Sequence, residues 1–175
     1  MLICISGPSG VGKTTLSKIV AASLGIEKVT YLCGDDLHKW SRASDQWKTF
    51  THLEPLANNL ELGREQILKL LDGEPVFRAR YNHSTGLFDA PVKIFPTEKI
   101  IYEGLHALYD EQINEKSYLS LYVETESSLK QKWKINRDIN ERGYSLDKVI
   151  DSIQRRKTDE EKYIAPQRNN ADAIL

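Results

Sequence analysis

Residues 7–14 read Gly-Pro-Ser-Gly-Val-Gly-Lys-Thr, a complete phosphate-binding loop of the pattern G-x-x-x-x-G-K-S/T. The apolar run Leu2–Ile5 precedes this loop, and a helix-forming stretch from Thr14 to Leu24 follows it. Glycines let the backbone bend so that successive N–H groups point inward, and the N-terminal end of the new helix adds positive potential. Because strand, loop and helix stand in order, a chance glycine-rich turn is the weaker interpretation, and we expect a nucleoside triphosphate site.

The loop also predicts roles for individual side chains. Lys13 can reach the outer phosphates, and the hydroxyl of Thr14 can bind the Mg²⁺ ion of the nucleotide. The residues expected to hold the nucleotide here are Gly7, Ser9, Gly10, Val11, Gly12, Lys13, Thr14 and Thr15.

Composition narrows the class of protein. The chain has 175 residues, 40% of them hydrophobic, and a net charge of −1, which predicts one domain and gives no sign of a nucleic-acid or membrane partner. The segment 128–168 carries 11 Lys and Arg against 7 Asp and Glu, which is typical of a phosphate clamp or of a solvated helix surface. No signal peptide and no apolar run of membrane-spanning length is visible, so we expect a cytoplasmic protein.

Strand-like and helical segments alternate along the chain, which favours a parallel α/β sheet with helices on both faces. The expected strands are Leu2–Ser6, Val29–Cys33, Lys99–Tyr102, Leu119–Val123 and Ala171–Leu175. Helices are expected at Thr14–Leu24, along the apolar stripe from Leu60 to Leu71, at Ser127–Arg142 and at Leu146–Arg156. The segments Trp40–His52 and Pro75–Pro96 lack clear periodicity, and we interpret both as irregular loops that line a substrate site or form a lid.

The second expected strand runs into Gly34-Asp35-Asp36-Leu37-His38. Because ligands of open α/β sheets bind beyond the carboxyl ends of the strands, Asp35 should face the phosphates. It could accept a proton from an attacking hydroxyl or help to hold Mg²⁺, while His38 and Arg42 could bind an anionic acceptor. A turn or helix cap is an equal alternative for Asp36, as is a buried hydrogen-bonded side chain for His38.

Two further segments contain charged residues whose positions predict a role in binding metal or phosphate. Glu103 follows the third expected strand, where it would reach Mg²⁺ directly or through water. On the expected helix 127–142, Lys134, Asp138 and Arg142 share one face, and the cluster Arg155-Arg156-Lys157 follows one helix later. Either these cations belong to a lid over the transferring phosphoryl group, or they are solvated surface ion pairs of little energetic weight.

Together these stretches resemble the phosphoribulokinase/uridine kinase family over nearly the whole chain. The stretches at residues 53–59, Leu-Glu-Pro-Leu-Ala-Asn-Asn, and 81–87, Tyr-Asn-His-Ser-Thr-Gly-Leu, resemble phosphoribulokinases more than uridine kinases. The other stretches that carry the resemblance are the loop at 7–15, the turn at 35–38, Glu-Gly-Leu-His-Ala-Leu-Tyr-Asp at 103–110, the segment 134–143, and Tyr-Ile-Ala-Pro-Gln at 163–167 followed by Ala-Asp-Ala-Ile at 171–174.

The resemblance implies roles for residues that match the family's motifs. Asp35 would be the general base, with Asp138 as a second essential carboxylate, and Thr14, Glu103 and Asp35 would be the metal ligands. Lys13, Lys134, Arg137 and Arg142 would hold or neutralise phosphate, Arg137 acting in catalysis and Arg142 on the nucleotide. The acceptor pocket would be lined by His38, Arg42, Tyr81 and His83, with Lys134 on the acceptor. Arg155 and Arg156 would contact the acceptor's own phosphate or close the lid.

The resulting hypothesis is a single P-loop kinase domain over 1–175, with a helical lid at approximately 137–162 and five parallel strands, for which the resemblance implies the order 2-3-1-4-5. It would transfer the γ-phosphoryl group of Mg·ATP to a small sugar-type acceptor, ribulose 5-phosphate in the first instance. Two alternatives stay open: a uridine/cytidine kinase that stacks a base on Tyr81 and Trp40, and a nucleotide-binding regulator without turnover. A homo-oligomer stays open too.

Overall fold

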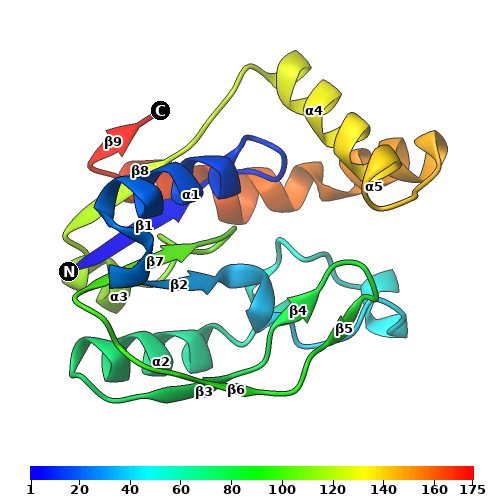
Figure 1. The fold of residues 1–175 in the computed structure, drawn as a ribbon. Helices are drawn as coiled ribbons and strands as arrows, with labels where there is room; N and C mark the ends of the chain where they lie inside the picture. The colour runs from blue at the N-terminus through cyan, green and yellow to red at the C-terminus, as the bar shows by residue number, and fades with distance from the viewer.

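A five-stranded parallel sheet forms the centre of the protein in the computed structural model, which describes all residues 1–175 (Figure 1). Its strands are β1 (Leu2–Ser6), β2 (Val29–Cys33), β7 (Lys99–Glu103), β8 (Leu119–Tyr122) and β9 (Ala173–Ile174). The spatial order is β2-β7-β1-β8-β9, so the expected sheet and its order are confirmed. The first strand therefore lies at the centre, and the loop that leaves it opens at the middle of the sheet's carboxyl edge.

Helices cover both faces of the sheet because buried strand residues alternate between two hydrophobic clusters. Leu2 and Cys4 of β1 belong to the cluster that includes Ile67 of α2 (Leu60–Leu71) and Ile113 of α3 (Glu111–Lys116). Ile3 and Ile5 point the other way, into the cluster with Ala21 of α1 (Lys13–Leu24). In Figure 1 α1 overlaps the strands of the sheet, and α2 lies below them. No helix combines the length and apolar character needed to cross a membrane.

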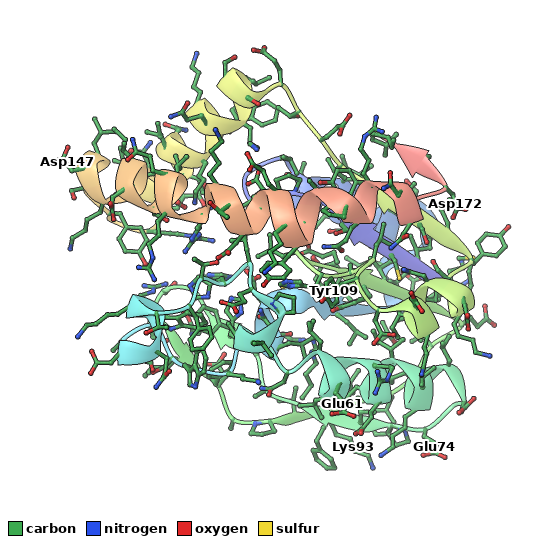
Figure 2. The ribbon with its side chains drawn as sticks, turned by 180° about the vertical axis from the view of Figure 1, so that it is seen from behind. Glu61, Glu74, Lys93, Tyr109, Asp147 and Asp172 are labelled. Carbon is green, nitrogen blue, oxygen red and sulfur yellow. The ribbon has the colours of Figure 1, made fainter.

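The last two helices extend beyond the carboxyl edge of the sheet (Figure 1). They are α4 (Ser127–Asn140) and α5 (Leu146–Asp159), joined by a turn in which Gly143 has φ of +69°. The chain then continues through a π-helical turn, Glu160–Ile164, and a 3₁₀ segment, Ala165–Asn170. Figure 2 shows this path from behind, from Asp147 at the start of α5 to Asp172 beside β9. The π-helical turn continues the helix past the expected end at Arg156, to Ile164.

The segment Pro75–Pro96 is not the irregular loop that its lack of periodicity predicts. It forms two small antiparallel sheets, β3 (Val76–Arg78) with β6 (Val92–Ile94) and β4 (Tyr81–Asn82) with β5 (Leu87–Phe88). Strands of two or three residues are too short to show the alternation that marks a strand in sequence. In contrast, Trp40–His52 is irregular as expected, with one 3₁₀ turn at Asp45–Lys48.

Asp36 joins this region to the end of β2 and does not face the phosphate-binding loop. Its carboxylate accepts hydrogen bonds from Nε of the buried Arg78, at 3.1 Å, and from the backbone N–H of Tyr81, at 2.9 Å. Of the two alternatives for Asp36, the structure shows the structural one, in which it anchors β3 and β4.

Backbone contact between two glycines brings the ends of β2 and β7 together. A Cβ atom on Gly104 would lie 2.8 Å from the Cα of Gly34, and one on Gly34 would lie 3.0 Å from the Cα of Gly104. Any side chain at either position would separate the strand ends that carry Asp35 and Glu103.

We expect Gly104→Ala to destabilise the fold by about 1–3 kcal/mol, because the new methyl group meets backbone that cannot move aside. Gly63→Ala is the comparison variant: its Cβ would lie 2.5 Å from Cδ1 of the buried Leu37, a side-chain rather than a backbone contact, and the gain in helix propensity of about 1 kcal/mol offsets part of its cost. Urea denaturation of both variants measures the difference. Equal stability of the two variants would contradict the proposed backbone constraint.

Candidate active site

The phosphate-binding loop has the shape that its glycines predict. Gly7, Gly10 and Gly12 have φ of +144°, +90° and +94°, and a Cβ on Gly7 would lie 2.2 Å from the carbonyl oxygen of Val123. Lys13 is buried, and its Nζ donates to the carbonyl oxygen of Pro8 at 2.7 Å. Burial lowers the pKa of Lys13, although the nearby carboxylates of Glu103 and Asp35 oppose that shift. A buried ammonium with one protein acceptor keeps donors for an anionic ligand.

Val11 belongs to the loop by position, but its side chain points into the core. It is buried in the same hydrophobic cluster as Ile5. Any contact of Val11 with a nucleotide is therefore limited to its backbone, whereas the side chains of Thr14 and Thr15 are exposed at the start of α1.

Glu103 ends β7 beside the loop, as expected for a metal-bearing carboxylate. Only 4% of the residue is exposed, and its Oε1 accepts from the Thr14 hydroxyl at 3.2 Å and from the Tyr31 hydroxyl at 2.8 Å. Because the Thr14 hydroxyl donates its proton to Glu103, its lone pairs point elsewhere. A hydroxyl and a carboxylate held together are a ligand set that suits Mg²⁺.

Asp35 lies in the turn after β2 and is paired with two histidines. Its carboxylate is 3.1 Å from Nε2 of His83 and 3.8 Å from Nε2 of His38, and its side chain is 30% exposed. Burial alone would raise the pKa of Asp35, but the hydrogen bond from His83 and the charges of His38, His83 and Lys13 hold it well below its usual range. Asp35 is therefore an ionised carboxylate able to accept a proton.

The orientation of His38 is set by Asn58, which sequence reasoning did not single out. The amide nitrogen of Asn58 donates to the carbonyl oxygens of His52 and Glu54, so its oxygen is the acceptor for Nδ1 of His38 at 2.8 Å. Asn58 lies within the Pro-x-Ala-Asn-Asn stretch, and that stretch was the available signal.

Aromatic rings and Arg42 form the wall beside Asp35. The ring of His38 lies 5.3 Å from that of Tyr81 and 4.4 Å from that of His52, centroid to centroid, and Trp47 stacks on His52 at 3.8 Å. Arg42 donates to the carbonyl oxygen of His83. The predicted acceptor residues His38, Arg42, Tyr81 and His83 thus meet in one place, although they come from two separate loops.

Helix α4 lies directly on the phosphate-binding loop. A Cβ atom on Gly10 would lie 3.0 Å from the Cβ of Lys134, and Arg137 reaches the hydroxyl of Ser9 at 3.4 Å. Asp138 is buried and is bonded to Lys134 at 2.7 Å and Arg137 at 2.8 Å, with Arg142 3.4 Å away. Burial and the charge of Arg156 lower the pKa of Lys134 to about 8, although Asp138 opposes them. The predicted row is therefore a buried cluster rather than a solvated face.

Arg155 and Arg156 line the same cavity, but only Arg155 has hydrogen bonds to the loop. Arg155 donates to the carbonyl oxygen of Trp47 and, at 3.1 Å, to that of Phe50. Asp159, one turn later, accepts from the hydroxyl of Thr51 at 2.6 Å. These bonds connect α5 to the loop that carries the acceptor residues.

Arg156 faces inward, where burial lowers the pKa of its guanidinium although Asp138 opposes that shift. It lines a cavity of about 100 Å³ between α5 and the loop. His52 lines the same cavity, and its buried Nδ1 has no hydrogen-bond partner. The cavity therefore combines two guanidinium groups, the carboxylate of Asp151 and an unpartnered imidazole nitrogen, a lining that suits a strongly polar ligand.

The chain is similar to known proteins along its whole length. The Phosphoribulokinase / Uridine kinase family model matches residues 2–175. The phosphoribulokinase of Synechocystis sp. is 39% identical over 175 residues, which cover 100% of this chain and 53% of that protein. The chloroplastic phosphoribulokinase of Spinacia oleracea is 33% identical, with 100% and 48% covered. The chain therefore spans about half the length of these relatives. A uridine kinase of Halobacterium salinarum is 32% identical, with 99% and 78% covered.

Solved structures agree on the fold. A phosphoribulokinase from Rhodobacter spheroides superposes with a TM-score of 0.78 at 23% identity, covering 99% of this chain and 68% of the other. A D-glycerate 3-kinase from Cryptococcus neoformans gives a TM-score of 0.65 at 14% identity, with 96% and 80% covered.

His106 provides a pH-dependent test of how the site is packed. It is 6% exposed, its Nε2 lies 2.8 Å from the carbonyl oxygen of Leu53, and burial lowers its pKa to about 4 although that hydrogen bond opposes the shift. A histidine whose folded pKa is lowered stabilises the fold above its unfolded pKa, and this contribution is lost as pH falls toward the folded pKa. We therefore expect the free energy of unfolding to fall by on the order of 2 kcal/mol between pH 7 and pH 5 on account of His106.

The measurement is urea denaturation of the wild type and His106→Gln at both pH values. The variant should be less stable at pH 7 but lose less stability on acidification, because glutamine does not titrate in this range. An equal loss in both proteins would show that His106 is not held neutral by burial.

Proposed function

The chain belongs to the phosphoribulokinase/uridine kinase family, and on that premise we propose that it is a kinase that transfers the γ-phosphoryl group of ATP to a hydroxyl of a phosphopentose, ribulose 5-phosphate in the first instance. The observation that carries this proposal is the arrangement of Asp35, a carboxylate beside the phosphate-binding loop, near a cluster of cations on α4 in which Lys134 is buried and Arg137 and Arg142 are half-buried. A protein that used the nucleotide only as a switch would not need an ionised base in this position.

The nucleotide would bind along the loop from Gly7 to Thr15. Its phosphates would take the inward backbone N–H groups and draw Nζ of Lys13 away from the carbonyl oxygen of Pro8. Thr14 and Glu103 would hold Mg²⁺, with Asp35 as the third metal ligand to be tested. When bound, the ion neutralises charge on the phosphates. The residues fit it because the Thr14–Glu103 pair presents oxygen atoms alone.

Asp35 would orient the acceptor hydroxyl and accept its proton as the phosphoryl group is transferred. Phosphoryl transfer otherwise needs positioning and charge stabilisation more than covalent chemistry. Lys134, Arg137 and Arg142 would supply that charge once the phosphates compete with Asp138 for their N–H groups. Asp138 would thus hold these cations in place before the nucleotide arrives.

A phosphorylated sugar suits the acceptor pocket better than a nucleoside does. Arg156 and the unpartnered Nδ1 of His52 line the cavity beyond His38. A guanidinium binds phosphate through two parallel N–H donors. A nucleoside would leave this buried charge unpaired.

Uridine/cytidine kinase activity is the competing candidate. The Halobacterium relative named uridine kinase is covered over 78% of its length, a larger share than for the phosphoribulokinases. The cluster of Tyr81, Trp47 and Trp40 could stack a base.

We expect Asp35→Asn to lower kcat by on the order of 10²–10⁴, the range for loss of a positioned acid or base. Affinity for ATP should stay within about threefold, because Asp35 contacts the acceptor side of the site. Turnover assays and isothermal titration with ATP measure the two quantities. Turnover of the variant close to that of the wild type would remove Asp35 from the role of base.

Turnover rates on a panel of pentoses, pentose phosphates and nucleosides identify the acceptor. Two variants at neighbouring positions of α5 test the role of the cavity. We expect the wild type to prefer a pentose phosphate, and Arg156→Ala to raise the acceptor KM by about 10–100-fold with the ATP KM nearly unchanged, since a charged hydrogen bond is lost. Lys157→Ala is the matched control and should leave the acceptor KM nearly unchanged, because Lys157 is exposed on α5 and does not line the cavity. Faster turnover of uridine or cytidine than of every sugar phosphate would move the chain to the nucleoside kinases.

A further inference from the structure

Tyr31 is bonded to Glu103, yet no motif in the sequence includes it. Its hydroxyl donates to Oε1 of Glu103 at 2.8 Å, a shorter contact than the 3.2 Å from Thr14. Strand register explains how the two meet. Tyr31 of β2 pairs with Ile101 of β7, so Glu103 lies two residues further along on the same face of the sheet, the face covered by α1.

The Tyr31 hydroxyl has two hydrogen-bond partners, and their chemistry determines the direction of both bonds. Ser17 of α1 is fully buried, and its Oγ lies 3.2 Å from the hydroxyl oxygen of Tyr31. A tyrosine hydroxyl has a single proton, and an ionised carboxylate can only accept. The Tyr31 proton therefore goes to Glu103, and Ser17 donates to the oxygen of Tyr31, sharing its proton with the carbonyl oxygen of Thr14 at 3.0 Å.

The bonds at Glu103 all converge on one oxygen. Thr14, Tyr31 and, at 3.7 Å, the thiol of Cys33 all donate to Oε1. No cation is within bonding distance of Glu103, although the charges of Glu103 and Lys13 interact. The neutral donors thus hold one oxygen in place and leave the lone pairs of Oε2 for another ligand.

We propose that Tyr31 is a positioning residue that orients Glu103 for the metal of the bound nucleotide, an inference that rests on the proposed function. Without the phenolic hydroxyl, the Thr14 hydroxyl is the only strong donor left on Oε1. The carboxylate is then free to rotate, and its Oε2 is no longer held toward the metal. Partners that orient a ligating carboxylate typically contribute 10–100-fold to metal affinity.

Tyr31→Phe tests the proposal because it removes the hydroxyl and keeps the ring. We expect Mn²⁺ to bind the complex of the variant with adenylyl imidodiphosphate about tenfold more weakly than the wild-type complex, measured by electron paramagnetic resonance of free Mn²⁺. Binding of the same nucleotide in EDTA should be unchanged. In assays the Mg²⁺ concentration for half-maximal rate should rise by a similar factor, while kcat at saturating Mg²⁺ stays within about twofold of the wild-type value. General destabilisation of the protein would not change the Mg²⁺ requirement and leave kcat unchanged.

Three further variants keep the test specific. Ser17→Ala should weaken Mn²⁺ binding in the same direction but less, because it removes only the donor to Tyr31. Tyr118→Phe, in an exposed tyrosine at the opposite end of the sheet, should have no effect. In a double-mutant cycle, Tyr31→Phe should cost nothing further in Glu103→Gln, since both changes act through one carboxylate.

The possible results distinguish a failure of the role of Tyr31 from a failure of the proposed nucleotide site. Equal Mn²⁺ affinity of Tyr31→Phe and the wild type, or full additivity with Glu103→Gln, would overturn the role of Tyr31 and leave the nucleotide site intact. A wild type that binds Mn²⁺ no more tightly with the nucleotide than without it would overturn the proposed site, and the role of Tyr31 with it.

Discussion

At the carboxyl edge of the sheet the backbones of β2 and β7 touch at Gly34 and Gly104, where a Cβ on Gly104 would lie 2.8 Å from the Cα of Gly34. This contact brings Asp35 and Glu103 to neighbouring positions beside the phosphate-binding loop, which leaves the adjacent strand β1. The loop itself is as tightly constrained, since Gly7 packs on the backbone of Val123 and Gly10 on helix α4. Close packing at these glycines therefore brings the phosphate-binding loop, Asp35 and Glu103 together.

The same crowding keeps several charged groups away from water, and this has a functional consequence. Lys13, Glu103, Lys134 and Asp138 are all buried, and hydrogen bonds rather than solvent stabilise most of their charge. In such surroundings electrostatic interactions are stronger than in water, so the site is organised for a polyanion before one binds. The bonds of Arg155 and Asp159 extend this organisation to the segment Trp40–His52, because they connect that segment to helix α5.

Local sequence patterns were sufficient to predict the scaffold. The loop at residues 7–14, the five core strands and the main helices could be read from glycine spacing, apolar runs and helical periodicity, because each pattern depends on neighbours in the chain. Family resemblance added the strand order, which the sheet confirms. The short strands of Pro75–Pro96 were missed because two or three residues carry no period, and helix α5 continues past its expected end because a π-helical turn has no local signal.

Only the tertiary structure decides which residues far apart in the sequence are bonded to each other. Nothing in the sequence connects Tyr31 with Glu103, or Arg155 with Trp47 and Phe50, because these contacts span 72 to 108 residues. The sequence by itself determined which residue types occur at the carboxyl edge of a nucleotide-binding sheet. Only the fold decided which of two adjacent aspartates lies beside His83 in the candidate site and which anchors β3 and β4, because this depends on strand register and on how the following turn packs.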